Sequence, residues 1–187
     1  MIAFTVCDII EPLNGGLFVS PGFGIHARRI IDSYELIFVT QGRLDIFEGE
    51  RTFHLVRNQT LLLYPGIHHG GLLPYTDDVN FYWAHFRLRA AVCSDTILTV
   101  PKVASVRDPE GLTELFCRFI SDQELGILDR CGASQLIALM LCMVGESTEQ
   151  KRSVPGRARE RRSALVDAVC SYIAAEYHRP IKTSVIG

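Results

Sequence analysis

The sequence predicts an α+β protein, in which a small antiparallel β-barrel is followed by two antiparallel helices and a C-terminal helix fragment. Up to about residue 107, short runs of β-branched and aromatic residues alternate with turns that contain Gly or Pro, a pattern typical of antiparallel strands. Beyond residue 108 the apolar residues recur at helical spacing instead. We therefore expect a barrel domain over residues 1–107 and a helical segment over residues 108–145.

Three strand signals define the predicted barrel. A hairpin is expected at residues 34–47, where two apolar runs flank a glycine. A second run, residues 60–64, stops at Pro65-Gly66, because proline cannot continue a hydrogen-bonded ladder. Asn58 precedes this run and tolerates the left-handed conformation that a turn there requires. A further strand, rich in aromatic residues, is expected at residues 79–88.

Two amphipathic helices are predicted next. Asp108 is a good N-cap and Pro109 suits the first helical position, so a helix should begin there and end near Gly126. The second helix, from about residue 129 to 145, has apolar residues almost all round, and one barrel face cannot cover them all. Either the first helix or a second copy of the chain covers the remaining apolar surface of this helix, and we expect a homodimer. The expected interface residues are Leu136, Leu139, Met140 and Met143.

The last forty residues predict a linker and the start of another domain. Residues 146–162 are polar and strongly basic around Pro155-Gly156, which is typical of an interdomain linker. A nucleic-acid contact is the weaker interpretation, because no aromatic residue is interleaved to stack on bases. Residues 163–187 contain a third helical pattern.

Composition indicates a cytoplasmic protein. No apolar run approaches membrane-spanning length, and the N-terminus lacks the basic region of a signal peptide. The six cysteines show no CxxC pairing, so reduced thiols are expected rather than disulfides or a zinc site. The net charge of −2 gives no overall attraction to nucleic acid.

Three ordered motifs resemble the effector-binding domain of AraC-type transcription regulators. They are YEL-x-FV-x-x-G from Tyr34, LLLYPG-x-x-H ending at His69, and FYW-x-HF from Phe81. The resemblance covers roughly the first 90 residues and implies a cupin-like barrel that binds a small-molecule effector, with a sugar as the first candidate. It also implies dimerisation through the helices after the barrel.

The segment LVDAVCSYIAAEYHRPI, residues 165–181, looks like the first helix of the DNA-binding domain of these regulators, which carries two helix-turn-helix units. No recognition helix follows in this sequence. We therefore expect the chain itself not to recognise specific DNA, which the parent regulator would bind through the missing C-terminal domain.

The first motif of cupin enzymes can also be laid on this chain, but without its two histidines. The motif falls on Gly22, Arg28, Ile30, Glu35 and Gly42. Arg28 and Ile30 hold the histidine places, and an arginine would repel a divalent cation. We therefore expect no metal and no cofactor. The alternative metal site would use His26, Glu35 and His69.

A polar lining for a small ligand suits these positions better. Arginine offers a planar fork of donors, and glutamate accepts hydroxyl protons. If Glu35 points inward, alternation along the strand turns Ile37 inward too, and Phe81, Trp83 and His85 share one face of the last strand. In AraC-type regulators a tryptophan on that strand lies against the sugar, a role that the resemblance gives to Trp83. The expected ligand-binding residues are Arg28, Glu35, Trp83, His69, His26, Phe81, His85 and Ile37.

Simpler interpretations of these residues remain open. Trp83 and Phe81 are equally suited to core packing, and Arg28 with Glu35 to a structural ion pair. The expected function is effector sensing and dimerisation in an AraC-type regulator. The alternative is a metal-dependent or metal-free cupin enzyme, an isomerase or dioxygenase, with Glu35 and His69 as acid and base. The sequence arranges no nucleophile or oxyanion site, so we expect no catalysis.

Overall fold

The computed structural model describes residues 2–5, 9–89 and 97–149 of the 187-residue chain. In chain order its elements are β1 (Ile2–Thr5), β2 (Ile9–Val19), β3 (Arg29–Ile30), β4 (Tyr34–Gln41), β5 (Arg43–Glu48), β6 (Arg51–Val56), β7 (Gln59–Leu63), β8 (His68–Gly71), β9 (Asn80–Arg89), β10 (Ile97–Val100), β11 (Val103–Ser105), α1 (Pro109–Glu124) and α2 (Arg130–Glu149). Residues 146–149 of the predicted linker belong to α2, which therefore runs past its predicted end at residue 145. The rest of the linker and the predicted C-terminal helix lie outside the described residues.

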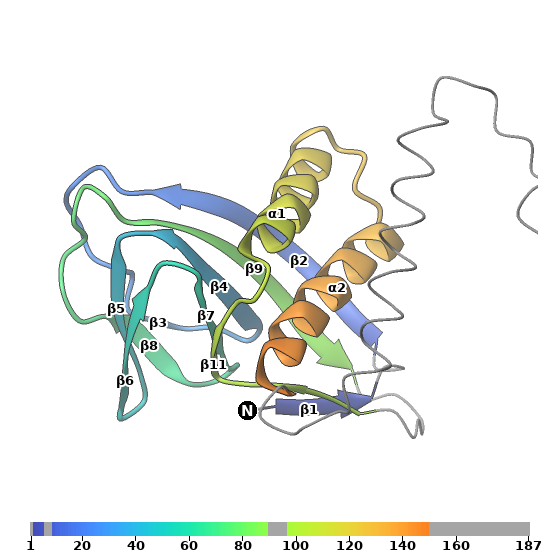
Figure 1. Cartoon of the computed structure of the whole chain (residues 1–187), viewed down its shortest axis with the longest axis horizontal. Coiled ribbons are helices and arrows are strands. Elements are labelled where there is room, and N and C mark those ends of the chain that lie inside the picture. The colour runs from blue at the N-terminus through green and yellow to red at the C-terminus, as the bar shows by residue number, and fades with distance from the viewer. Residues whose placement is uncertain (1, 6–8, 90–96, 150–187) are drawn as a thin grey trace, which may run out of the picture. The chain divides into compact units, whose positions relative to one another are not determined.

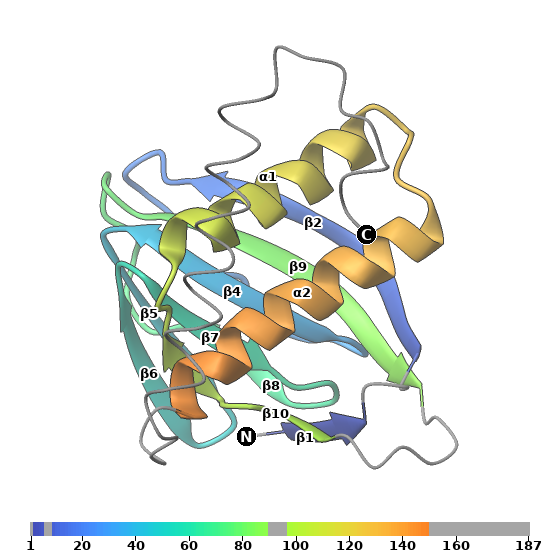
Figure 2. The same cartoon turned by 45° about the vertical axis from the view of Figure 1, so that its right-hand side comes forward.

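The domain has three layers. A five-stranded sheet of order β11-β7-β4-β9-β2 forms the middle layer, and a four-stranded sheet of order β3-β8-β5-β6 faces one side of it. Helices α1 and α2 cover the other side (Figure 1; Figure 2). All the strand pairs are antiparallel, including the separate pair β1–β10. This confirms the predicted fold class of an antiparallel β domain followed by helices, although the two sheets do not close into one hydrogen-bonded barrel.

Alternation along the central strands divides the core in two. Leu36 and Phe38 of β4 point toward the helices, where they join Phe86 and the apolar face of α1. Ile37 points the other way, into the core between the two sheets, where Phe81 and Trp83 also pack. The inward face predicted for β4 and β9 is therefore the face that lies between the sheets.

The helix signals correspond to real caps. The Asp108 carboxylate accepts a hydrogen bond from the Gly111 N–H at 2.9 Å, and Pro109 opens α1 as predicted. Asp129 plays the same part for α2, accepting from the Gly132 N–H at 2.8 Å. No helix in the described ranges has both the length and the apolar character needed to cross a membrane.

Much of the apolar surface of α2 is buried within the domain itself. The helix packs on β2, β10, β11 and α1. Met140 is fully buried in the core beneath it, whereas the Leu139 residue is 53% exposed and Leu136 and Met143 are half-buried. Met140 was predicted at a dimer interface, and that placement is wrong, because the central sheet already covers this side chain.

Strand β2 contains a bulge that α1 stabilises. The register of β2 against β9 shifts between Pro12 and Gly15. There the Gln123 side chain of α1 accepts a hydrogen bond from the Gly15 N–H at 3.0 Å and donates one to the Gly15 carbonyl at 3.1 Å. A single amide thus satisfies both backbone groups of this strand residue. The turn prediction for Asn58 is also confirmed, since its φ is +66°.

Candidate functional site

A cavity of about 270 Å³ opens at one end of the space between the two sheets. Its lining residues are Phe18, Ile25, His26, Ala27, Arg29, Glu35, Tyr75, Phe81 and Trp83. They come from β2, the segment before β3, β3 itself, β4, the loop before β9, and β9. One wall is thus aromatic and the other polar, which is the usual composition of a small-molecule site.

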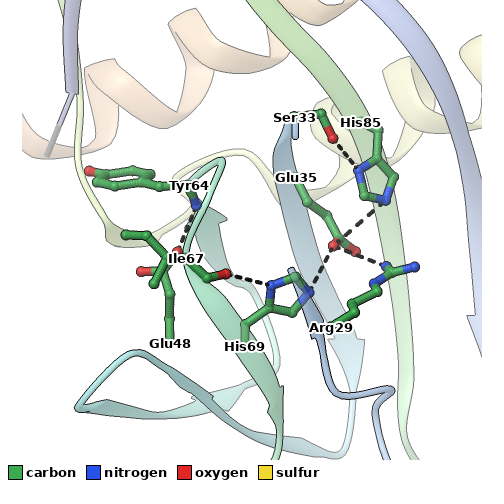
Figure 3. A network of polar contacts seen from close by, with 8 residues as sticks. All are labelled: Arg29, Ser33, Glu35, Glu48, Tyr64, Ile67, His69 and His85. Atoms are coloured by element: carbon green, nitrogen blue, oxygen red, sulfur yellow. Dashed lines mark hydrogen bonds and ion pairs between the residues drawn. The ribbon is translucent and has the colours of Figure 1, made fainter. Parts of the chain in front are cut away.

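Glu35 is the centre of the polar wall. The residue is 1% exposed, and its Oε2 lies 3.4 Å from the Arg29 guanidinium and 3.7 Å from His85 Nε2 (Figure 3). Burial raises the pKa of the Glu35 carboxyl to about 7, against the opposing effect of the Arg29 charge and hydrogen bond. The carboxyl therefore gains and loses its proton near neutral pH.

Three buried imidazoles surround this carboxyl. His69 Nε2 lies 4.0 Å from Glu35 Oε2, and its Nδ1 faces the Ile67 carbonyl at 3.4 Å. His85 Nδ1 lies 3.0 Å from the Ser33 hydroxyl. Burial, and then repulsion by His69, lowers the pKa of His26 to about 4. Burial lowers the pKa of the other two imidazoles as well, so all three are neutral at pH 7.

Two of these imidazoles present atoms without a partner. Within the described residues, Nε2 of His26 and Nε2 of His69 are both buried and make no hydrogen bond. One ligand atom each from His26, His69 and Glu35 lies within 4.8 Å of the others. These are the three residues that the sequence offered as the alternative metal set.

Arg28 lies elsewhere than expected. It was predicted to face Glu35, but it is exposed and its guanidinium lies over the Phe47 ring, 5.7 Å from the ring centroid. Arg29 makes the Glu35 contact instead, because the β3–β8 register pairs Arg29 with His69 at the edge of the cavity. Position 30 is also turned outward, with the Ile30 residue 66% exposed.

The aromatic wall includes two residues that the sequence did not single out. Phe18 of β2 stacks on Phe81 with ring centroids 4.8 Å apart, and Tyr75 lies 4.6 Å from Phe18. Trp83 is half-buried at the cavity and makes an edge contact with His85 at 5.3 Å. No local pattern marks Phe18 or Tyr75, because the first lies in a Gly-rich strand and the second in a loop.

Ile37, the remaining predicted residue, lies in the core, and His68, the sequence neighbour of His69, lies at the surface. Ile37 is fully buried in the core between the sheets and does not line the cavity. His68 is exposed beside Phe47, with ring centroids 5.2 Å apart. The structure therefore brings His26, Glu35, His69 and His85 into one cluster and sets Phe81 and Trp83 beside it.

A larger hollow of about 410 Å³ lies between β2 and the α1–α2 connection. Its charged lining residues are Glu11, Asp129 and Arg130, and Glu11 already pairs with Arg89 and Arg130. It contains none of the predicted ligand-binding residues and only one aromatic, Phe119. The smaller cavity between the sheets is chemically the better ligand site.

The fold and this cavity are those of a small-molecule-binding domain. Residues 20–166 match the family model of the AraC-like ligand-binding domain, and the chain belongs to that family. An uncharacterized HTH-type transcriptional regulator of Bacillus subtilis (strain 168), YisR, is 33% identical over 76 residues, which cover 37% of this chain and 26% of that protein. The match thus spans about a quarter of the Bacillus regulator.

Similar solved structures are more distant. Apo ToxT K231A from Vibrio cholerae strain SCE256 matches 96% of this chain and 68% of its own, with 10% identity and a TM-score of 0.42. The vicilin of Solanum melongena matches 80% of this chain and 36% of its own, with 12% identity and a TM-score of 0.23.

Proposed function

We propose that this domain senses a small polar metabolite, with a sugar as the first candidate, in the cavity between its sheets. The bound state then controls a DNA-binding domain elsewhere in the regulator, in the cytoplasm. The observation that carries the proposal is that the buried Glu35, paired with Arg29 at the rim, lies with an aromatic wall in one cavity. Membership in the AraC-like ligand-binding family supports it.

The chemistry of the two walls suits a polyol. The guanidinium of Arg29 donates to hydroxyl oxygens, while Glu35 accepts from a hydroxyl when ionised. The C–H face of a sugar ring packs on flat aromatic surfaces, which Trp83 and Phe81 supply. Such a site recognises its ligand without forming or breaking a covalent bond, so we propose no catalytic activity.

Trp83 provides a direct test, because it is the single tryptophan of the chain. The purified protein should be screened against sugars, sugar alcohols and sugar acids by thermal shift, and each hit repeated by tryptophan fluorescence. A true effector raises the melting temperature and changes the Trp83 emission. A compound that stabilises the protein without changing this emission binds elsewhere and contradicts the proposed site.

We also propose that the effector domain is a homodimer through α2. The half-buried Leu136 and Met143 flank the exposed Leu139 on one side of this helix, and a second copy of α2 offers the same apolar stripe. Leu139→Glu should convert a dimer into a monomer in sedimentation at tens of micromolar. Leu125→Glu, at an exposed leucine outside α2, is the matched control and should leave the dimer intact. A monomeric wild-type chain under these conditions would overturn the proposal.

A further inference from the structure

We propose that His26, Glu35 and His69 bind one divalent transition-metal ion at the inner end of the cavity. Their ligand atoms lie within 4.8 Å of one another, and all three side chains are buried. Metal ligands at 2.0–2.2 Å from an ion lie about 3–4 Å apart, so small rotamer adjustments close the site. This proposal does not depend on which effector the domain senses.

The orientation of His69 supports a metal ligand. Its Nδ1–H donates to the Ile67 carbonyl, which leaves the Nε2 lone pair directed toward Glu35 (Figure 3). Metal-binding histidines commonly donate their second ring nitrogen to a backbone carbonyl in this way. His85 is anchored similarly by Ser33 and holds the far side of the same carboxyl.

The cluster also carries a cost that a metal would remove. A buried ring nitrogen without a hydrogen bond is rare in folded proteins, and His26 and His69 each have one beside the buried Glu35. One ion would satisfy both nitrogens and the Glu35 carboxylate at once.

The donor set selects the class of metal. Two imidazoles and one carboxylate suit Zn²⁺, Co²⁺, Ni²⁺ or Fe²⁺, whereas Mg²⁺ and Ca²⁺ prefer oxygen ligands. Three protein ligands leave at least one coordination position open. His26 and Glu35 line the cavity, so water or an effector oxygen can reach the ion and complete its coordination.

A nearby arginine is the main objection to a metal site. The sequence analysis predicted no metal because Arg28 and Ile30 occupy the histidine places of the cupin motif. Neither Arg28 nor Ile30 faces Glu35, so that argument does not apply to the folded chain. Arg29 does face it, but through a single 3.4 Å contact from a side chain that is 43% exposed. A side chain at the rim can turn its charge toward solvent when an ion binds.

Cobalt offers a direct test, because tetrahedral or five-coordinate Co²⁺ absorbs visible light. The chain should be treated with EDTA, dialysed, titrated with Co²⁺ in the absence of any sugar, and analysed for bound metal. We expect one equivalent of Co²⁺ per chain, and His69→Ala or His26→Ala should weaken binding by at least about tenfold. His68→Ala is the matched control at the neighbouring exposed histidine and should bind like the wild type.

A second variant guards against loss of folding in the histidine variants. Arg29→Gln removes a positive charge next to the site from a partly exposed side chain, so it should fold and bind Co²⁺ more tightly than the wild type. No stoichiometric binding by the wild type, or binding that His68→Ala weakens as much as His69→Ala, would overturn the proposal. A sugar that binds the EDTA-treated chain leaves the sensor function standing whatever the metal result.

Discussion

Lys102 and Glu48 form a buried ion pair beside Tyr64. The Lys102 side chain is 12% exposed and that of Glu48 4%. Glu48 Oε1 also accepts the Tyr64 N–H at 2.6 Å, and the Lys102 ammonium lies 3.8 Å from the Tyr64 ring centroid. Burial lowers the pKa of Lys102, and the Glu48 hydrogen bond and charge oppose that shift.

Removing one member of this pair should cost more than removing both charges. Lys102→Met leaves the Glu48 carboxylate buried without its counter-charge, so we expect a loss of about 3–5 kcal/mol in the free energy of unfolding. The double variant Lys102→Met/Glu48→Gln removes both charges and keeps an acceptor for Tyr64, so it should recover much of that loss. Urea unfolding measures the free energy of unfolding of all three proteins. Equal losses of this free energy in the single and double variants would show that the unpaired Glu48 carboxylate carries no special cost.

Arg29, which lines the cavity, and its neighbour Arg28, which does not, give the sharpest comparison at the residue scale. Once an effector is found, Arg29→Ala should weaken its binding by about 1–3 kcal/mol, because a buried acceptor loses a charged donor. Arg28→Ala should change the affinity little, since Arg28 lies over Phe47 outside the cavity. Isothermal titration measures both. The opposite ranking would restore the sequence-based assignment of Arg28.

The sequence could not separate these two arginines. They have the same chemistry, and their facing depends on the β3–β8 register, which involves residues 40 positions apart. The motif spacing selected Arg28 because it assumes a continuous strand, whereas no strand includes residues 21–28. Glu35, Trp83 and Phe81 lie on the strand faces that alternation predicts, because each lies inside a regular strand.

Among the elements, β2 shows where pattern reasoning fails. The segment contains Pro12 and two consecutive glycines, which normally argue against a strand. It forms one nevertheless, because it is an edge strand with a bulge and α1 supplies the missing hydrogen bonds. The two helices, by contrast, were predicted from caps and spacing that lie within the elements themselves.

Gln123 should therefore matter more than an ordinary glutamine at a helix end. Gln123→Ala leaves the N–H and carbonyl of Gly15 without their partner, so we expect a loss of about 1–3 kcal/mol in unfolding free energy. Gln135→Ala, on the exposed side of α2, should stay within about 0.5 kcal/mol of the wild type. Thermal or urea unfolding distinguishes them, and similar small losses would show that water replaces the amide at no cost.

The whole molecule is organised by the central sheet, which contributes side chains to both cores. The order of strand and helix segments could be predicted from the sequence, because strand and helix periodicities differ. The gap between the two sheets could not be predicted, since closure of a barrel depends on hydrogen bonds between segments far apart in the sequence. The packing of α2 was likewise unreadable, because an all-round apolar helix does not reveal whether sheet or partner covers each face.

Adjacent residues of α2 should respond differently to truncation for this reason. Met140→Ala removes a fully buried side chain and should cost about 2–5 kcal/mol. Leu139→Ala should cost little of the domain's own stability at concentrations where the chain is monomeric. Unfolding of both variants at high dilution checks this, and equal losses would place Leu139 in the core as well.

Gly15 and Gly16 make the partition between cavity and helices unusually thin. A Cβ on Gly16 would lie 2.8 Å from the Trp83 ring, and one on Gly15 would lie 3.0 Å from the Phe119 ring of α1. The Trp83 indole, which lines the cavity, and the Phe119 phenyl, which packs in the helix-side core, are thus separated only by the backbone of these glycines. No intervening side chain can change rotamer to absorb a displacement of the indole. A shift of Trp83 must therefore move the β2 backbone, and with it the packing of Phe119 on that strand.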